Sequence, residues 1–414
     1  MRQSHLFSHT RREAPKDEAS KNARILVRGG FIHKEMAGVY SFLPLGLRVI
    51  SRINNIIREE MNAIGGEEIL MSTLQSEEVW KKSGRWDDEA VPIWMKTKLK
   101  SGTEVGLGFT HEEPIVNMLK NHISSHKDLP VYVYQIQNKF RNETRAKSGL
   151  MRTREFLMKD LYSFSKDEDS HAKFYDKVKE AYFKVFNRVG LGGKTHLTYA
   201  SGGSFSKYSH EFQTLTDAGE DHIHICTTCK TAVNEEIIHE HKICPECSGK
   251  DFKKEKAVEV GNIFNLGTRF SEALELFYRD DDGKEKAVVM GSYGIGPGRV
   301  MGTIAEIYSD LNSLVWPESV SPYAFHLIAL SGKNSDITKE ADKIYHKLTS
   351  SGVSVLFDDR EISAGEKFAD ADLIGIPKRL VLGERSLSSG KLEYKNRVTG
   401  EEKNLSLEEL LGEL

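Results

Sequence analysis

Phe140-Arg141-Asn142-Glu143 and, after a basic loop, Met151-Arg152-Thr153-Arg154-Glu155-Phe156 form the most informative stretch of this 414-residue chain. The pattern predicts two strands joined by a polar loop, with arginines at both ends of the hairpin and an aromatic residue on the return strand. Arginine forks suit bidentate contact with carboxylate or phosphate groups. Such a hairpin would clamp the phosphates of a nucleotide. The alternative is a charged hairpin exposed to solvent.

A second informative stretch is Gly291-Ser292-Tyr293-Gly294-Ile295-Gly296-Pro297-Gly298-Arg299. Its glycines predict a turn at which the backbone approaches a ligand closely. Arg299 is expected at the start of a helix, where an arginine can meet a phosphate near the N-terminus. The stretch is not a Walker phosphate loop, because no Gly-Lys-Ser/Thr follows it. A glycine-rich turn without a ligand is the alternative.

Composition places the chain among ordinary globular proteins, with 39% hydrophobic and 29% charged residues. Its length predicts two or three domains. No apolar run approaches the ~20 residues of a membrane helix, and Met1–Thr10 has no apolar core like that of a secretory signal. We therefore expect a cytoplasmic protein without a membrane partner. The net charge of −3 implies that any RNA binding depends on individually placed residues.

Hydrophobic periodicity in the first ~320 residues predicts an α+β fold with antiparallel strand pairing. A helix is expected after Pro44, because Leu47, Ile50, Ile53, Ile57 and Met61 form one apolar stripe, and Gly65-Gly66 should end it. The sequence further predicts a helix over 173–189. Strands are expected at 67–71, 131–136, 155–164 and 287–290.

The pattern changes beyond Val315-Trp316-Pro317 and Ser321-Pro322, where two prolines indicate a domain boundary. Strands are expected at 325–330, 353–357 and 379–382, with a helix at 337–348. This alternation predicts a largely parallel α/β domain. The domains proposed from sequence are a catalytic domain in two parts (1–221 and 259–318), an insertion (222–258) and a C-terminal domain (319–414).

The insertion contains all four cysteines of the chain, Cys226, Cys229, Cys244 and Cys247. Two Cys-x-x-Cys pairs at this spacing are typical of tetrahedral zinc. Because four thiolates leave no open position, the metal would be structural. A relic knuckle with reduced cysteines is the alternative.

Taken together, these stretches resemble class II aminoacyl-tRNA synthetases, with motif 1 at Gly46–Leu74, motif 2 at Phe140–Phe156 and motif 3 at Gly291–Arg299. Further strings are similar to the bacterial type of prolyl-tRNA synthetase, and the resemblance covers nearly the whole chain. They are Thr110-His111-Glu112-Glu113-Pro114, Tyr134-Gln135-Ile136-Gln137, Arg154–Asp160, Ser209-His210-Glu211-Phe212, Val260–Thr268, Asp358-Asp359-Arg360 and Leu373–Pro377.

The resemblance implies an antiparallel-sheet catalytic domain that activates L-proline with ATP and transfers it to tRNA(Pro). Arg141 and Arg299 are the implied catalytic residues, because adenylate formation depends on positioning and charge stabilisation. The implied ATP contacts are Arg141, Glu143, Arg152, Phe156, Gln213, Glu272 and Arg299. Mg²⁺ would neutralise the remaining phosphate charge, with Glu272 as a possible ligand; an ordinary solvated acid is the alternative for Glu272.

The implied proline contacts are Thr110, Glu112, Arg141, His210 and Ser292. Glu112 would accept from the cationic imino group. Thr110 and Glu113 are also spaced as a helix capping box, with Pro114 just inside the helix, so Thr110 has a structural alternative. A satisfied structural histidine is likewise the alternative for His210.

The C-terminal α/β domain resembles the family's anticodon-binding domain, with candidate tRNA contacts at Arg360, Glu366, Lys367 and Phe368. A solvated loop is the alternative for each of them. Motif 1 implies a homodimer. The chain departs from the family pattern at Ser72, where motif 1 usually has proline, and at Ser292, where many relatives have cysteine.

The interval between Glu220 and Val260 is shorter than the ~50–250 residues of an ordinary domain. The chain therefore is expected to lack the editing domain of many bacterial relatives, and a separate deacylase would have to clear misacylated tRNA. The alternative function is a non-catalytic, synthetase-like regulator that senses tRNA or amino acid. Such paralogues typically lose the motif arginines, which this chain retains.

Overall fold

A computed structural model describes residues 1–146, 148–203, 207–332 and 334–413. The chain divides into two compact units, and each is described by itself. The core unit comprises Met36–Val39 and Ile53–Thr303; the terminal unit comprises Met1–Glu35, Tyr40–Arg52 and Ile304–Leu414. The division falls within helices α2 (Pro44–Ala63) and α7 (Pro297–Ile307). No helix among the described residues has the length and apolar character needed to cross a membrane.

The core unit is built on a nine-stranded sheet with the order β10-β9-β12-β11-β13-β16-β8-β7-β3. Its strands are β3 (Glu67–Glu68), β7 (Val131–Phe140), β8 (Glu155–Ser165), β9 (Thr195–Ser201), β10 (Tyr208–Leu215), β11 (Asp221–Cys226), β12 (Ala232–Asn234), β13 (Phe252–Gly267) and β16 (Val289–Ile295). Smaller sheets combine β4 (Leu74–Ser76), β6 (Glu104–Leu107) and β5 (Lys96–Lys98), and β14 (Phe277–Arg279) with β15 (Glu285–Ala287). The helices are α3 (Glu77–Lys82), α4 (Glu112–Leu119), α5 (Glu168–Arg188) and α6 (Arg269–Ala273), with 3-10 turns η2 (His126–Asp128), η3 (Gly149–Met151), η4 (Gly192–Lys194) and η5 (Glu235–Glu240).

The centre of this sheet is antiparallel, as the sequence predicted. β7 and β8 pair along their whole length, from Val131 opposite Phe164 to Phe140 opposite Glu155. β8 pairs in turn with β16, and β16 with β13, both antiparallel. The hairpin formed by β7 and β8 therefore brings the predicted motif 2 beside the predicted motif 3.

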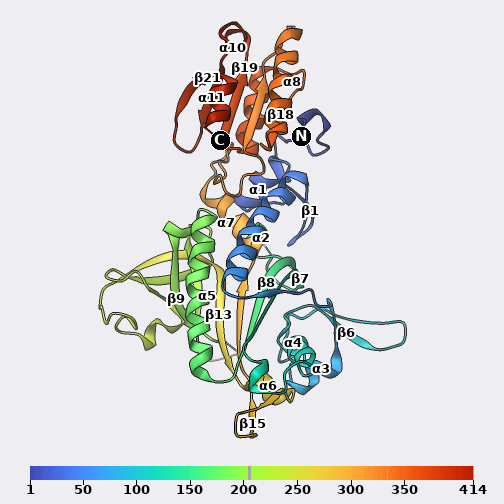
Figure 1. Cartoon of the computed structure of the whole chain (residues 1–414). Helices are drawn as coiled ribbons and strands as arrows, with labels where there is room; N and C mark the ends of the chain where they lie inside the picture. Colours follow the sequence, from blue (N-terminus) through green and yellow to red (C-terminus); the bar gives the residue numbers. More distant parts are fainter. Residues whose placement is uncertain (147, 204–206, 333, 414) are drawn as a thin grey trace. The chain divides into compact units, whose positions relative to one another are not determined.

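Helix α5 covers one face of the sheet, and Figure 1 shows it lying along β9 and β13. Its predicted apolar side is buried at Phe174, Val178, Tyr182 and Val185. The helix begins earlier than predicted, because the side chain of Asp167 caps it by accepting a hydrogen bond from the Ser170 backbone N–H at 2.8 Å. Burial of this stripe fixes the helix against the sheet.

Two elements near motif 1 differ from expectation. On α2, Ile50, Ile53, Ile57 and Met61 are buried but Leu47 is 56% exposed. The strand expected at 67–71 is reduced to β3, because glutamine side chains replace the strand ladder beyond it. Gln135 accepts from the Met71 backbone N–H at 3.1 Å, and Gln137 donates to the Met71 carbonyl.

The glycine-rich stretch is a strand rather than the predicted turn. Gly291 to Ile295 belong to β16, all buried, and the helix starts at Pro297. A side chain at Gly291 would place its Cβ 2.3 Å from the Tyr293 hydroxyl. The glycines therefore fit close packing within the sheet as well as approach to a ligand.

The terminal unit contains a five-stranded sheet with the order β18-β17-β19-β20-β21. The strands are β17 (Phe325–Ala329), β18 (Val355–Asp358), β19 (Lys378–Leu382), β20 (Leu392–Asn396) and β21 (Glu402–Leu405). The helices are α1 (Lys21–Arg28), α8 (Ser335–Ser350), α9 (Ala364–Ile374), α10 (Glu384–Ser389) and α11 (Leu407–Gly412), with the turn η1 (Gln3–His5) and the hairpin of β1 (Ile32–Met36) and β2 (Val39–Phe42). The first three strands pair in parallel, as predicted, whereas β20 and β21 add antiparallel pairs.

The division into units differs from the boundaries predicted from sequence. Residues 1–35 were assigned to the catalytic domain, but they belong to the same compact unit as the C-terminal sheet. Figure 1 shows the N-terminus beside β18. Hydrogen bonds between Met1–Thr10 and the C-terminal residues cause this grouping, and a linear reading of the sequence could not detect them.

Candidate active site

A group of adjoining cavities in the core unit is centred on Arg141. Three cavities share Arg141 and Glu259 in their walls. The two on one side are also lined by Glu143, Arg152 and Arg299. The third has a volume of about 480 Å³, and four of the five predicted proline contacts line it: Thr110, Glu112, Arg141 and Ser292. The structure thus brings together residues from both predicted motifs.

Arg141 follows the end of β7, where its backbone N–H donates to the Arg154 carbonyl at 2.8 Å. Its guanidinium lies between two aromatic rings, 4.9 Å from the centre of Phe109 and 5.3 Å from that of Phe156. Its Nε is buried without a hydrogen-bond partner among the described residues. Burial, followed by the charge of Arg299, lowers the pKa of Arg141. A cation held in this way favours an anionic ligand.

The other two arginines of the cavity are paired with carboxylates. Arg152 donates from Nε to Glu143 at 2.9 Å and from Nη1 to Glu220 at 2.8 Å. Arg299, on the first turn of α7, donates to the Glu259 backbone carbonyl at 2.8 Å and lies 3.2 Å from its carboxylate. These exposed or half-buried pairs cost little to exchange for phosphate contacts.

The floor between the cavities is formed by β13 and β16. Gly294 lines both the Phe156 side and the Glu112 side. A Cβ at Gly294 would lie 2.7 Å from Oδ1 of Asn262, whose Nδ2 donates to Glu259 at 2.7 Å. Glycine is needed there so that the floor stays open beside Phe156.

Glu112 lines the 480 Å³ cavity and is 2% exposed. The Thr110 hydroxyl donates to Glu112 at 2.6 Å, and the Ser292 hydroxyl donates to its other oxygen at 3.0 Å. The capping-box alternative for Thr110 is wrong: the N-cap of α4 is His111, without a side-chain cap bond. Thr110 and Ser292 instead orient a buried carboxylate.

Glu113 points away from this arrangement into a buried contact with Arg85. Arg85 Nη1 lies 3.0 Å from Glu113 and 3.6 Å from Glu112. Burial raises the pKa of Glu113 to about 7, and the Arg85 charge opposes that shift. Arg85 therefore supports both acidic residues at the start of α4.

His210, a predicted proline contact, does not line the 480 Å³ cavity. It lies on the α5 face of β10, where its Nδ1 is 2.7 Å from the Tyr175 hydroxyl. Burial lowers the pKa of His210 to about 4. The neighbouring Glu211 lines the cavity instead, because adjacent residues of a strand face opposite sides. Burial, and then the charge of Glu259, raises the pKa of Glu211 to about 8.

Two predicted ATP contacts also lie outside the cavity walls. Gln213 is buried behind them and donates to Glu211 and Asp221, at 2.8 Å in each case. Glu272 is an exposed residue of α6 that accepts from the Thr268 hydroxyl at 2.7 Å, as the solvated-acid alternative expected. The acidic residue at the centre is Glu259, which sequence reasoning missed. It directly precedes the quoted string Val260–Thr268, so extending that string by one residue would have found it.

The four cysteines form a compact cluster beside β11 and β13. Sγ of Cys226 lies 3.6 Å from that of Cys247, and Sγ of Cys229 lies 3.5 Å from that of Cys244. All four sulfur atoms lie within 4.8 Å of one another. Tetrahedral zinc with Zn–S bonds of ~2.3 Å places its sulfurs ~3.8 Å apart, so the residues fit this ion.

In the terminal unit, three of the four predicted tRNA contacts have internal partners. Lys367 is 2% exposed and donates to the Ala329 carbonyl at 2.6 Å. Arg360 binds Asp358 through Nε and Nη2, and Glu366 forms a capping box with Ser363 at the start of α9. Phe368 alone borders a cavity, of about 810 Å³, that Arg379, Arg385 and Lys391 also line.

Both units match known families of domains. Residues 95–308 match the tRNA synthetase class II core domain (G, H, P, S and T), and residues 325–414 match the anticodon binding domain. The first match includes Arg141, Arg152, Glu259 and Arg299, and the second contains the Phe368 cavity.

Similar proteins of full length agree with these matches. The chain is 36% identical over 436 residues to a proline–tRNA ligase of Agrobacterium fabrum, covering 99% of this chain and 98% of the relative. It is 32% identical over 564 residues to a proline–tRNA ligase of Halothermothrix orenii, covering 100% and 99%. In fold, it is similar to a prolyl-tRNA synthetase of Cryptosporidium parvum complexed with L-proline and AMP, with a TM-score of 0.76 at 17% identity over 98% of this chain and 79% of that one. The chain therefore belongs to the proline–tRNA ligases, a family of class II aminoacyl-tRNA synthetases.

Proposed function

We propose that this chain activates proline with ATP and transfers it to tRNA, and that the cavities around Arg141 carry out the first step. The observation that carries this proposal is the Arg141 guanidinium, which lies between the Phe156 cavity and the Glu112 cavity with a buried Nε that lacks a partner. The reaction joins a carboxylate to the α-phosphate of ATP at such a junction. One arginine fork can hold both anions.

Each side of the junction suits one substrate. On the Glu112 side, the buried carboxylate oriented by Thr110 and Ser292 would accept hydrogen bonds from the cationic imino group. On the Phe156 side, adenine would stack on the aromatic ring. Arg152 and Arg299 would exchange their carboxylate partners for the outer phosphates. The carboxylate of proline then attacks the α-phosphate and pyrophosphate leaves; the charge that develops is stabilised by Arg141.

Proline-dependent exchange of pyrophosphate into ATP tests this proposal directly. Active exchange by the pure, metal-replete chain is expected, with no exchange when proline is omitted. A chain that binds proline and tRNA without exchange would instead be the synthetase-like regulator. The retained Arg141, Arg152 and Arg299 favour the enzyme over that alternative.

Glu259 is the residue that we propose for Mg²⁺, in place of Glu272. It lines all three cavities and lies beside Arg299, where the phosphates of ATP would enter. Mg²⁺ commonly binds one or two carboxylates together with substrate phosphates. Asp221 lines one of the same cavities and is the second candidate.

The Phe368 cavity is proposed as the surface that receives the anticodon. Five basic residues line it against two acidic ones, Glu393 and Glu402, and Phe368 offers a ring for base stacking. The basic residues are Arg379, Arg385, Lys391, Lys395 and Lys403. Unpaired bases of RNA are commonly bound by stacking and cationic side chains. Phe368 is thus kept from the original prediction, whereas the internal pairs of Arg360, Glu366 and Lys367 favour structural roles.

The four cysteines are proposed to hold one structural Zn²⁺ per chain. Elemental analysis of protein purified without chelator should give about one zinc per chain, and Cys229→Ser should reduce that content and lower the melting temperature. Unchanged stability of a metal-free wild-type chain would support the relic knuckle. Because the cluster has four thiolates, the metal is not expected to take part in catalysis.

Further partners also belong to this proposal. A homodimer is proposed, because motif 1 implies a contact between two subunits, and light scattering tests it. Ser72 is the position of motif 1 that departs from the family pattern. A separate deacylase is proposed because proline and alanine differ by few methylene contacts, each worth only ~1–3 kcal/mol in discrimination. Formation of stable alanyl-tRNA by the pure enzyme would support it. A cytoplasmic location fits reduced cysteines.

A further inference from the structure

The first ten residues form an arm that contacts the C-terminal sheet, and the proposed function assigns them no role. The arm pairs with the edge strand β18: the Phe357 backbone N–H donates to the Met1 carbonyl at 2.9 Å, and Arg2 forms a parallel bridge with Phe357. The arm and the sheet belong to the same compact unit, although more than 300 residues separate them in sequence.

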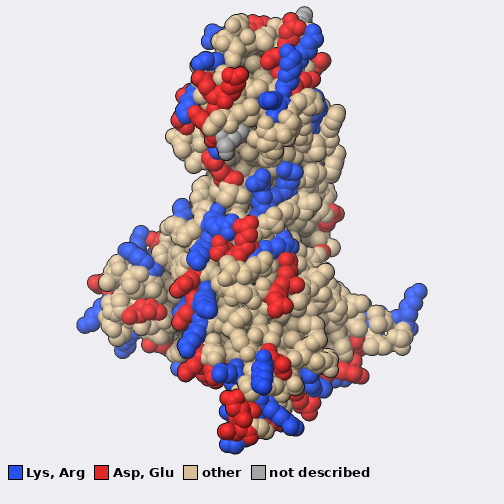
Figure 2. Space-filling view, in the orientation of Figure 1, with Lys and Arg blue, Asp and Glu red and all other residues tan. Residues whose placement is uncertain are grey.

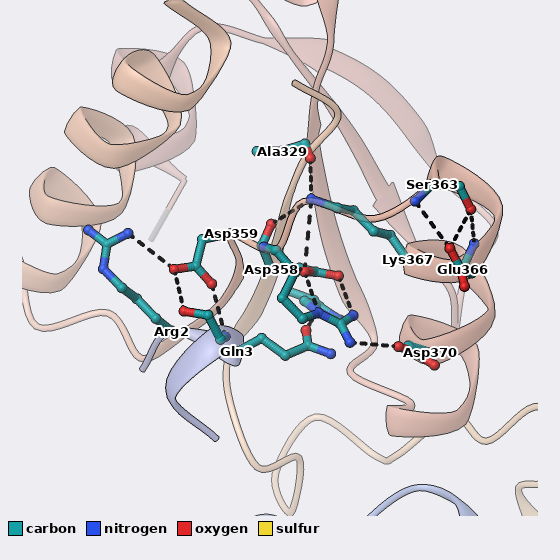
Figure 3. Close-up of polar contacts among 12 residues, drawn as sticks. Arg2, Gln3, Ala329, Asp358, Asp359, Ser363, Glu366, Lys367 and Asp370 are labelled. Atoms are coloured by element: carbon teal, nitrogen blue, oxygen red, sulfur yellow. Dashed lines mark hydrogen bonds and ion pairs between the residues drawn. The ribbon is translucent and has the colours of Figure 1, made fainter. Parts of the chain in front are cut away.

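Arg2 and Ser4 contact Asp359, the residue that follows β18. Arg2 Nη1 donates to Asp342 at 2.7 Å and lies 3.5 Å from Asp359. Ser4 donates to Asp359 from both its backbone N–H, at 3.0 Å, and its hydroxyl, at 2.7 Å. Figure 3 shows the Arg2 guanidinium directed toward the Asp359 carboxylate. The start of the loop between β18 and α9 is therefore fixed from outside the C-terminal domain.

Gln3 reaches a buried histidine on the central strand. Gln3 is 4% exposed, and its Oε1 lies 3.1 Å from Nε2 of His326, which is fully buried. His326 is in register with Arg379 on the neighbouring parallel strand, so both side chains emerge on the same face of the sheet. Arg379 lines the proposed anticodon cavity.

Thr10 holds helix α9 itself. Its hydroxyl donates to Asp370 at 2.5 Å, and Arg360 binds the other oxygen of Asp370 at 2.9 Å. Arg360 also binds Asp358, whose backbone carbonyl accepts from Lys367 at 3.3 Å. Figure 3 shows Lys367 directed toward the Ala329 carbonyl and Asp358, with Asp370 on the same helix. Lys367 directly precedes Phe368, the aromatic residue of the cavity.

We propose that the N-terminal arm is a positioning element for the anticodon cavity: Arg2, Ser4 and Thr10 fix the β18–α9 loop and α9, and thereby hold Phe368 and the Asp372–Arg379 pair in place for RNA. The inference rests on the proposed anticodon cavity. Asp372 of α9 links the helix to the cavity wall. It accepts a hydrogen bond from Arg379 at 2.7 Å, and the Arg379 guanidinium lies 5.5 Å from the Phe368 ring. The arm affects RNA binding through α9 and does not contact the RNA itself.

The test uses the full chain with the double substitution Arg2→Ala and Thr10→Val. Two rates are measured: proline-dependent pyrophosphate exchange and aminoacylation at varied tRNA concentration. Loss of such hydrogen-bonded contacts should raise the KM for tRNA by about five- to tenfold, with kcat and exchange within about twofold of wild type. Lys16→Ala, which removes an exposed charge from the same region, is the matched control.

A double-mutant cycle with Arg385→Ala separates positioning from direct contact with RNA. If the arm acts through the cavity, its effect on KM should shrink when Arg385 is already removed, because coupled sites are not additive. Ser4→Ala should raise KM, and Ser4→Thr, which keeps the hydroxyl, should restore it. A KM equal to that of Lys16→Ala, full additivity, or a parallel loss of exchange would each overturn the inference. Absence of exchange in the wild type would overturn the proposed function instead.

Discussion

Two sets of charged residues in this chain are similar in composition but differ in what their side chains contact. In the core unit, the Arg141 guanidinium faces a cavity, and Arg152 and Arg299 are held by half-exposed carboxylates. In the terminal unit, Arg360 and Lys367 are bound to the fully buried Asp358. The first set can contact a ligand, whereas the second set is paired with a buried carboxylate and stabilises the fold.

The difference shows why family resemblance predicts the two sets unequally. A buried charge must be paired or hydrogen-bonded, so Lys367 serves the structure even though it lies beside a ligand surface. An arginine between aromatic rings with an unsatisfied Nε is a site for an incoming anion. Figure 2 shows acidic and basic side chains interspersed on the face drawn, so surface charge alone would not have separated the two sets.

The largest effect is expected for Arg141→Ala, which removes the junction between the two substrates. Loss of one such charge-stabilising contact should reduce proline-dependent exchange by ~10²–10³-fold, with the melting temperature nearly unchanged because the buried Nε has no hydrogen-bond partner among the described residues. Steady-state exchange rates provide the measurement. Arg145→Ala, at an exposed position of the same loop, should leave exchange within a few-fold of wild type. Equal loss in both variants would remove the distinction drawn for Arg141.

A smaller effect, and on stability rather than chemistry, is expected for Lys367→Met. The Ala329 carbonyl and Asp358 would lose a buried donor, which should lower the free energy of unfolding by ~1–3 kcal/mol. Urea denaturation of the full chain measures this change, with exchange as evidence that the core unit is intact. Lys347→Met on the exposed side of α8 is the matched control. Normal stability with impaired tRNA charging would instead assign Lys367 to RNA contact.

The smallest effect concerns the pH dependence of Glu211. Its pKa is raised to about 8 by burial, so the folded chain holds a proton that the unfolded chain loses near its ordinary pKa of ~4.3. Stability from this group is therefore present at low pH and falls as the pH rises through about 8. Glu211→Gln, which stays neutral, should raise the melting temperature relative to wild type more at pH 9 than at pH 6. A shift of the same size at both values, or an equal pH response in exposed Glu180→Gln, would contradict this assignment.

Much of the fold could be predicted from periodicity and breakers alone. The hairpin of β7 and β8 and the amphipathic α5 follow from patterns with a period of two or three to four residues. The glycine-rich stretch was misjudged, because glycines in a closely packed central strand and glycines in a turn have the same local sequence.

The candidate site was predicted where its residues belong to long motifs, as Arg141, Glu112 and Arg299 do. His210 does not line the cavity, because a shift of one residue along a strand changes the face on which a side chain lies. Glu272 lies outside the walls of the Arg141 cavities, and an acidic residue at a helix start has the same sequence signature whether or not a ligand is near. Glu259 was missed, because its place in the site depends on contacts that the sequence does not show. Arg299 of α7 and Asn262 of β13 both donate hydrogen bonds to Glu259.

The sequence by itself determined the family, the three motif arginines and the cysteine spacing, because these depend on residue types at fixed short separations. Only the tertiary structure decided which charges are free and which are paired, because each pairing joins segments far apart in the chain. Arg2 with Asp359 and Ser292 with Glu112 are such contacts. Burial then sets the energetic outcome, since a desolvated charge is stable only where a distant segment supplies its partner.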